Sequence, residues 1–246
     1  MQKIPSRWLF CGDSITDGNH SLCGDPNHIM GHGFAFLAAA FLAAEYPQLM
    51  PKSYNTAHSG INSAQLLAAW EKRALNIEPD VLTLLVGVND TLTLFNPEKS
   101  PLQKSLAAPE AYRENLRCML SLARKQNPQL HILMGIPFYY PAAALPGLSD
   151  RPYDAAEKEF ILNIRRESQH DRELKAADIL TRQLIVREVA EQFKAHILDY
   201  PAIFARAAEQ APIEYWVWDG IHPTVAGHML MFKCWLQSCR DNGIIP

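Results

Sequence analysis

The sequence predicts an α/β fold built around one open sheet of parallel strands. Hydrophobic periodicity alternates along the 246 residues between short strand-like runs and longer helical runs. Each short run ends in polar or glycine residues, where a strand gives way to a loop. Strands that alternate with helices join through crossover connections and therefore pair in parallel. We expect five such βα units within a single domain that spans residues 1–246.

The expected elements follow one another in a regular order. The predicted strands are the apolar runs at residues 8–11, 53–57, 81–86, 131–135 and 195–198. Helical periodicity predicts helices over residues 33–45, 63–76, 109–126, 154–193 and 223–239. In a doubly wound sheet of order 2-1-3-4-5, the first strand lies between the second and the third. Functional side chains of such a sheet gather outside the carboxyl ends of its strands.

Composition is typical of one globular protein with a sizeable core, since 48% of the residues are hydrophobic and 20% are charged. The least regular region is residues 137–169, where prolines precede a charged stretch. It is a candidate cap-like excursion beside the site. We favour the alternative, a surface loop that leads into a solvated helix.

Charge and targeting signals exclude several partners. A net charge of -3 and a pI near 6.3 leave no basic stripe, so we expect no nucleic acid partner. Residues 1–7 lack the apolar stretch of a signal peptide, and no window is long enough to cross a bilayer. The five cysteines form no Cys-x-x-Cys pair, which favours reduced thiols. We therefore expect a cytoplasmic protein without a membrane partner; a homo-oligomer stays open.

Two short motifs, one near each end of the chain, supply the parts of a serine nucleophile. Gly12-Asp13-Ser14 ends the first apolar run, and Asp219 precedes His222 by three residues. A serine hydroxyl needs a neutral imidazole to accept its proton and a carboxylate to orient that imidazole. If Pro223 opens the last helix, the positive end of that helix would help to keep His222 neutral. The absence of Gly-x-Ser-x-Gly excludes a nucleophile elbow.

An oxyanion hole is expected beside Ser14. Gly60 follows the second predicted strand and Asn89 follows the third, so both would flank Ser14 in the order 2-1-3-4-5. The backbone N–H groups of Ser14 and Gly60 and the side-chain amide of Asn89 could converge on one oxygen. Each such donor contributes on the order of 3 kcal/mol in the transition state.

These motifs together resemble the four blocks of the SGNH, or GDSL-type, family of serine esterases and lipases. The blocks are Gly-Asp-Ser, the Gly60 loop, Gly-Val-Asn-Asp and Asp-Gly-Ile-His-Pro, and the resemblance covers nearly the whole chain. It implies a three-layer α/β/α sandwich of the flavodoxin-like type, the triad Ser14, Asp219 and His222, and the oxyanion donors Gly60 and Asn89. Ile15 stands where the family name has leucine, and Ser63 stands where many members have a second glycine.

Each motif alone has a simpler structural explanation. Gly-Asp-Ser is a common turn, and Asn89 or Asp90 could cap a helix. His222 could merely precede a helix that starts at Pro223. The four motifs in one order and in matching strand contexts favour catalysis.

A second group of residues could be interpreted as a metal site, but we discount this interpretation. His20, Cys23, His28 and His32 lie close together in the sequence, but in a stretch that is typical of a loop. A tetrahedral zinc site needs four well-placed ligands. We expect no metal and no cofactor, and we expect His228 to serve packing or to lie at the surface.

Residues beside the motifs indicate the substrate. Asp13, Asn62 and Asp90 are polar candidates for substrate binding, and Tyr139, Trp216 and Trp218 could stack on sugar rings. Any one of these aromatic residues could instead fill the core or a subunit interface. Phe138 and the run from Pro141 to Pro146 could line an acyl channel.

The residues from 218 to 228 look most like the acetylxylan esterase branch of the family, with its related carbohydrate deacetylases. The leading hypothesis is a serine esterase that removes acetyl groups from oligosaccharides through an acyl-enzyme. The alternatives are a short-chain carboxylesterase or lysophospholipase and, remotely, a non-catalytic carbohydrate-binding protein. The natural ester, the sugar and the acetyl position stay open.

Overall fold

The computed structural model describes residues 5–21, 25, 28–141 and 168–246. Five parallel strands form one sheet in the order β2-β1-β3-β4-β5. The strands are β1 (Arg7–Gly12), β2 (Lys52–Asn55), β3 (Val81–Leu85), β4 (His131–Gly135) and β5 (His196–Leu198). The predicted fold class and strand order are confirmed.

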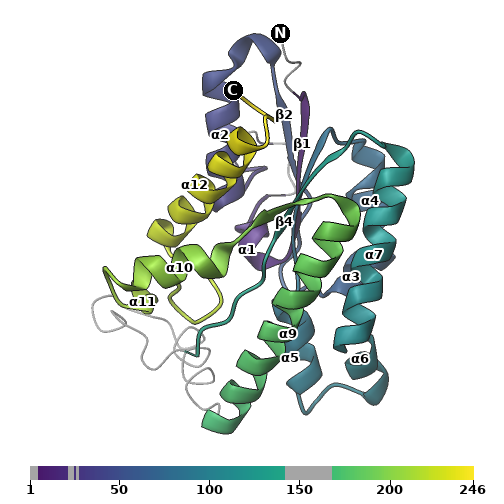
Figure 1. Cartoon of the computed structure of the whole chain (residues 1–246), viewed down its shortest axis with the longest axis vertical. Coiled ribbons are helices and arrows are strands. Elements are labelled where there is room, and N and C mark those ends of the chain that lie inside the picture. The colour runs from purple at the N-terminus through teal and green to yellow at the C-terminus, as the bar shows by residue number, and fades with distance from the viewer. Residues whose placement is uncertain (1–4, 22–24, 26–27, 142–167) are drawn as a thin grey trace.

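Helices cover both faces of the sheet and complete a three-layer sandwich (Figure 1). One face carries α2 (Phe34–Glu45), α10 (Tyr200–Ala208) and α12 (Val225–Asp241). The other carries α3 (Ser63–Ala68), α4 (Trp70–Arg73), α7 (Pro109–Gln126) and α9 (Gln169–Phe193). Short helices follow the strands or link the longer ones: α1 (Ser14–Asp17), α5 (Val88–Phe95), α6 (Pro101–Leu106) and α11 (Ile213–Trp216). Pro47–Leu49 and Leu75–Ile77 form single 3₁₀ turns.

Side chains of the central strands alternate between two hydrophobic cores, as the two-residue period of a strand requires. In β1, Leu9 and Cys11 pack towards the α7 face, whereas Trp8 and Phe10 pack towards the α12 face. Trp235 of α12 contacts both of the latter rings. Because its indole N–H donates to Thr83 Oγ1 of β3 at 3.0 Å, this buried polar group is satisfied. These contacts fix α12, and with it the chain that enters α12.

Three predicted helices differ from the observed ones. The expected helix over residues 63–76 is divided into α3, α4 and a 3₁₀ turn. The last helix begins at Val225 rather than at Pro223, because Pro223 pairs with Val217 in a β-bridge and Thr224 is the N-cap. The expected long helix is present as α9 from Gln169, and its first part lies outside the described residues. Most of the candidate excursion, residues 142–167, also lies outside them.

The carboxyl ends of β1, β2 and β3 lie next to one another in the sheet. Ser14 follows β1, Gly60 lies in the loop after β2, and Asn89 lies in the first turn of α5 after β3. The topology therefore brings three of the predicted site residues to one edge. Within the described chain, no helix is both long and apolar enough to cross a membrane.

Candidate active site

Ser14, His222 and Asp219 form a continuous hydrogen-bonded relay. Ser14 Oγ lies 2.8 Å from His222 Nε2, and His222 Nδ1 lies 2.6 Å from Asp219 Oδ2. Ser14 is the first residue of α1, while Asp219 and His222 belong to the loop between α11 and α12. Since a carboxylate only accepts, Asp219 fixes the tautomer with the proton on Nδ1. His222 Nε2 is then free to accept the serine proton.

The loop that carries Asp219 and His222 is closed at its neck by backbone hydrogen bonds. Val217 and Pro223 form the β-bridge, Trp218 N–H donates to the His222 carbonyl at 3.0 Å, and Thr224 N–H donates to the Trp216 carbonyl at 2.8 Å. This neck holds the loop in one shape.

Asp219 organises the tip of the same loop. Its Oδ1 accepts the backbone N–H groups of Ile221 at 2.9 Å and His222 at 2.6 Å, while its Oδ2 binds the imidazole. Such a turn around an aspartate explains why the two catalytic candidates are three residues apart. With both oxygens engaged, Asp219 is only 5% exposed.

The segment after β4 supports this loop from outside. Tyr140 N–H donates to the Gly220 carbonyl at 2.8 Å. The Tyr140 ring packs against Phe138 and Phe204, and Phe138 is fully enclosed by the core. The backbone beside His222 is therefore tied to the core through β4.

The oxyanion candidates lie in two segments that are bonded to each other, the loop after β2 and the first turn of α5. Asn89 Nδ2 donates to the Ile61 carbonyl at 3.1 Å, which leaves a second amide hydrogen on the same nitrogen. Gly60 has a φ of 80° and is exposed, with no heavy atom within 4 Å of the place a Cβ would take. Only glycine adopts this left-handed conformation without strain. A substrate can therefore approach the backbone at Gly60 closely.

The sequence matches the GDSL-like Lipase/Acylhydrolase family over residues 10–230. The chain belongs to this family. An acetylxylan esterase from Geobacillus stearothermophilus is 27% identical over 233 residues, which cover 93% of this chain and 91% of the relative. The predicted family is thus confirmed, and the protein is a carboxylic ester hydrolase.

Solved structures of other proteins share the fold of this GDSL-like hydrolase. A protein described as a GDSL-like lipase from Parabacteroides merdae superimposes with a TM-score of 0.75 at 26% identity, over 100% of this chain and 99% of its own. Axe2, an acetylxylan esterase from Geobacillus stearothermophilus, superimposes with a TM-score of 0.72 at 24% identity, over 96% of each chain.

The pKa of the catalytic candidate His222 lies above its usual value of 6.5. Burial is the largest single influence and lowers the pKa, but the hydrogen bond and charge of Asp219, together with the charge of Asp13, outweigh it and raise the pKa. The condition for the expected helix effect is not met, because the last helix starts at Val225 rather than at Pro223. The environment of His222 therefore favours its imidazolium form.

Asp13, which we expected to bind substrate, points into the protein. It is 1% exposed and its Oδ1 accepts the N–H of Ile15 at 3.1 Å, which caps α1. Burial raises the pKa of the Asp13 carboxyl to about 7. Asp13 thus caps α1, the helix that begins with Ser14, and adds a titrating group close to His222.

Asn62 and Asp90 likewise serve the loops in this structure. Asn62 and Gln65 form a capping box at the start of α3. Asp90 is fully buried and accepts Ser63 N–H at 3.0 Å and Ser63 Oγ–H at 2.5 Å. Asn115 of α7 also donates to Ser63 Oγ at 2.9 Å. Both side chains are therefore engaged in holding the Gly60 loop rather than turned to solvent.

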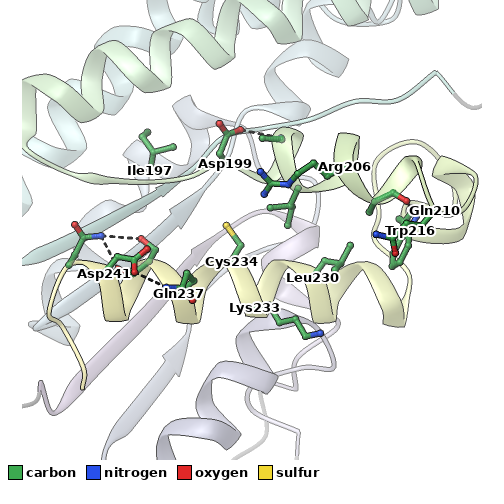
Figure 2. A pocket seen from close by; sticks show the side chains of 15 residues that line it. Ile197, Asp199, Arg206, Gln210, Trp216, Leu230, Lys233, Cys234, Gln237 and Asp241 are labelled. Carbon is green, nitrogen blue, oxygen red and sulfur yellow. Dashed lines mark hydrogen bonds between the residues drawn. The ribbon is translucent and has the colours of Figure 1, made fainter.

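The aromatic candidates divide between two places. Trp216 donates its indole N–H to the Ala207 and Ala211 carbonyls and lines a cavity of about 730 Å³ between α10 and α12 (Figure 2). No triad residue lines this cavity. Tyr139 and Trp218 are half-buried in the segments that flank the His222 loop. They remain the aromatic candidates nearest in sequence to Asp219 and to Tyr140, which binds the His222 loop.

Three histidines outside the triad have an observed partner. His20 Nδ1 lies 2.6 Å from Asp17 Oδ1, and His28 Nδ1 lies 2.8 Å from Asp25 Oδ2. His228 is buried and its Nδ1 accepts the N–H of Phe34; burial lowers its pKa to about 4. Among the described residues no three potential ligands gather closely enough to hold a metal ion, and Cys23 lies outside them.

Sequence reasoning did not assign the inner supports of the site. Asp17, Ser59 and Asn55 connect α1 to the loop that carries Gly60, yet none of them belongs to the motifs that indicated the triad. Their only signal is a position beside a motif residue. Contacts across some 40 positions of the chain leave no local pattern.

Proposed function

We propose that this hydrolase removes acetyl groups from acetylated oligosaccharides through an acyl-enzyme on Ser14. The relay from Ser14 through His222 to Asp219, with contacts of 2.8 and 2.6 Å, is the observation that carries the serine mechanism. It supplies both a nucleophile and a base already within proton-transfer distance.

Ser14 Oγ attacks the carbonyl carbon of the acetyl ester while its proton passes to His222 Nε2. The carbonyl π electrons move to the oxygen, which becomes an oxyanion and accepts from Ser14 N–H, Gly60 N–H and the Asn89 amide. Preorganised donors of this kind stabilise charge that develops only in the transition state. Asp219 stabilises the imidazolium formed on His222.

Collapse of the tetrahedral intermediate breaks the bond to the sugar oxygen, which takes the proton from His222 and leaves as an alcohol. Water then attacks the acyl-enzyme, with His222 again accepting a proton. The second collapse returns that proton to Ser14 Oγ and releases acetate. Two acyl transfers thus replace one direct hydrolysis.

The sugar substrate is supported by the acetylxylan esterase relative and by two half-buried aromatic residues, Trp218, which directly precedes Asp219, and Tyr139, which directly precedes Tyr140. Phe138, which could have lined an acyl channel, is instead packed among Tyr140, Tyr200 and Phe204. A long acyl chain needs a continuous apolar groove, because each buried methylene contributes about 0.8 kcal/mol. Because Phe138 is buried in the core and does not line a channel, the structure favours a short acyl group.

The test of the substrate compares kcat/KM on p-nitrophenyl acetate, butyrate and octanoate with acetate release from acetylated xylo-oligosaccharides. We expect the acetate ester to be preferred and acetate to be released from the sugars. A rate that climbs with acyl chain length, with no release from sugars, would identify a lipid esterase instead.

The serine mechanism has its own test. An organophosphorus inhibitor should add once to the wild-type protein, on the peptide that contains Ser14. Ser14→Ala should lose the adduct and the activity, whereas Ser105→Ala, which changes an exposed serine on α6, should keep both. An adduct of equal yield on Ser14→Ala would contradict the assignment.

A further inference from the structure

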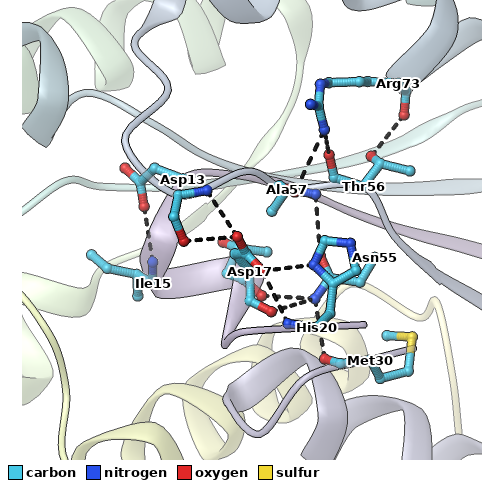
Figure 3. A network of polar contacts seen from close by, with 11 residues as sticks. Asp13, Ile15, Asp17, His20, Met30, Asn55, Thr56, Ala57 and Arg73 are labelled. Atoms are coloured by element: carbon cyan, nitrogen blue, oxygen red, sulfur yellow. Dashed lines mark hydrogen bonds and ion pairs between the residues drawn. The ribbon is translucent and has the colours of Figure 1, made fainter. Parts of the chain in front are cut away.

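Asp17, the last residue of α1, uses both carboxylate oxygens to hold two other segments (Figure 3). Its Oδ2 accepts the backbone N–H of Ser59 at 2.8 Å and the Ser59 hydroxyl at 2.7 Å. Its Oδ1 accepts the backbone N–H of His20 at 3.1 Å and lies 2.6 Å from His20 Nδ1. Asp17 itself is only 7% exposed, whereas its partner Ser59 lies at the surface.

Ser59 directly precedes Gly60. The peptide that joins the two residues contains the Gly60 N–H, so the position of Ser59 determines where that N–H points. Gly60 itself is exposed, and no heavy atom lies within 4 Å of the place that a Cβ would take. Its orientation must therefore come from the residues on either side.

Asn55, at the end of β2, strengthens the same connection. Its Nδ2 lies 2.9 Å from the Thr16 carbonyl and 3.1 Å from the Asp17 carbonyl, and its Oδ1 accepts Ala57 N–H at 3.1 Å. The chain after β2 is thus bonded to α1 twice, through Asn55 and through Ser59. Ser14 begins α1 and Asp17 ends it. One short helix therefore carries both the proposed nucleophile and the carboxylate that binds the Gly60 loop.

We propose that Asp17 is a positioning residue that fixes the Gly60 N–H relative to Ser14 Oγ, and so preorganises the oxyanion hole. This inference rests on the proposed serine mechanism. Without the carboxylate, the loop from Ser59 to Ile61 keeps its ties to Asn89 but loses those to α1. The Gly60 donor then spends less time where the oxyanion forms, which slows acylation without removing a contact to the bound ester.

Asp17 is ionised when it acts. Burial is the largest influence and raises its pKa, but the hydrogen bonds from Ser59 and His20 together outweigh it, so the pKa lies below the usual value. A charged acceptor makes stronger hydrogen bonds than a neutral one.

Asp80 provides a matched control at the far end of the sheet. Its Oδ2 accepts Ser6 N–H at 2.9 Å, the Ser6 hydroxyl at 3.0 Å and Arg7 N–H at 2.9 Å. Asp80 thus binds a serine through the same two groups as Asp17, but beside the amino ends of β1 and β3. Its loss should weaken the fold without reaching the oxyanion hole.

The experiment compares Asp17→Ala with Asp80→Ala for kcat and KM on p-nitrophenyl acetate, and for Tm, well below both melting temperatures. We expect Asp17→Ala to lower kcat on the order of 10- to 100-fold, with KM changed less than about 3-fold, since one oxyanion donor is misplaced rather than deleted. Asp80→Ala should lower Tm and leave kcat within about 2-fold.

If Asp17→Ala does not fold, Ser59→Ala, which removes only one hydrogen bond, takes its place with Ser6→Ala as control. Wild-type kcat in the folded Asp17 or Ser59 variant, or an equal loss of kcat in the control, would overturn the proposal. Wild-type protein that forms no organophosphorus adduct on Ser14 would instead overturn the serine mechanism itself.

Discussion

Asn89 Nδ2 lies 3.1 Å from the Ile61 carbonyl oxygen, which joins the turn after β3 to the loop after β2. One hydrogen of the amide is used in this bond. The other remains for an oxyanion, because a side-chain amide carries two donors. Asn89 thus ties α5 to the loop after β2 and keeps one amide hydrogen for the oxyanion proposed above.

We expect Asn89→Ala to lower kcat by a factor of about 100 to 1000 and to change KM less, because the lost donor acts on charge that develops in the transition state. Kinetics on p-nitrophenyl acetate measure kcat and KM, and thermal unfolding checks that the variant is folded. Asn96→Ala, at the other end of α5, removes an acceptor for Glu98 N–H and serves as the control. Near wild-type kcat in a folded Asn89→Ala protein would leave Asn89 with only a structural role.

The pH profile should report the His222–Asp219 pair. His222 must be neutral to accept the serine proton, so kcat/KM should fall as the pH drops through the raised pKa of His222, above 6.5. Asp219→Asn removes the negative charge that helps to raise this pKa. The acid limb should then move to lower pH while kcat falls by about 10⁴, as in triads that lose their carboxylate.

Profiles of kcat/KM between about pH 5 and pH 9 for both proteins measure the shift. The control is Asp199→Asn, since Asp199 pairs with Arg187 and caps α10 away from the triad. An unchanged limb in Asp219→Asn would mean that His222 is not the titrating base.

The sheet could be predicted because its signals are local. Each strand is a short apolar run that ends in polar or glycine residues. Such a run indicates a strand whatever its tertiary contacts are. The expected helix over residues 63–76 failed for a tertiary reason: the chain turns at Ala69, and Trp70 beyond it is 1% exposed in the core. Helix α1, only four residues long, depends on its cap by Asp13 and has no periodicity to detect.

The site could be predicted only in part, because motifs identify residue types but not the direction in which side chains point. Ser14, Asp219 and His222 were brought together as the motifs indicated. Asp13 and Asp90 were expected to face a sugar because they are polar, yet they are buried. A buried, hydrogen-bonded aspartate and an exposed one are identical in sequence, and only their partners distinguish them.

Prolonged chelation should leave activity intact. Ser14 and His222 supply the nucleophile and the base without a Lewis acid, so EDTA treatment followed by a p-nitrophenyl acetate assay should give the untreated rate. Loss of activity that added zinc restores would contradict this expectation. It would direct attention to His20, His28 and His32, the histidines of the stretch first considered as a metal site.

Asp13 makes stability depend on pH in the direction opposite to most aspartates. Its folded-state pKa, raised by burial from 3.8 to about 7, exceeds the unfolded value. The folded protein therefore binds this proton more tightly, and the resulting stability is present at low pH and lost as the pH rises from about 4 to about 7. At higher pH the folded state contains a buried carboxylate, which the charge of protonated His222 stabilises and the like charge of Asp90 destabilises.

Asp13→Asn replaces this carboxylate by a neutral group whose oxygen can still accept Ile15 N–H and cap α1. We expect the Tm of the variant, relative to wild type, to rise between about pH 5 and about pH 8. The acid limb of kcat/KM should also move to lower pH, because the charge of Asp13 helps to raise the pKa of His222. Asp80→Asn is the control: hydrogen bonds from Ser6 and Arg7 outweigh burial and lower the pKa of Asp80, so its loss should destabilise the fold equally at both pH values. A relative Tm of Asp13→Asn that stays constant or falls over this range would show that Asp13 is not a buried group of raised pKa.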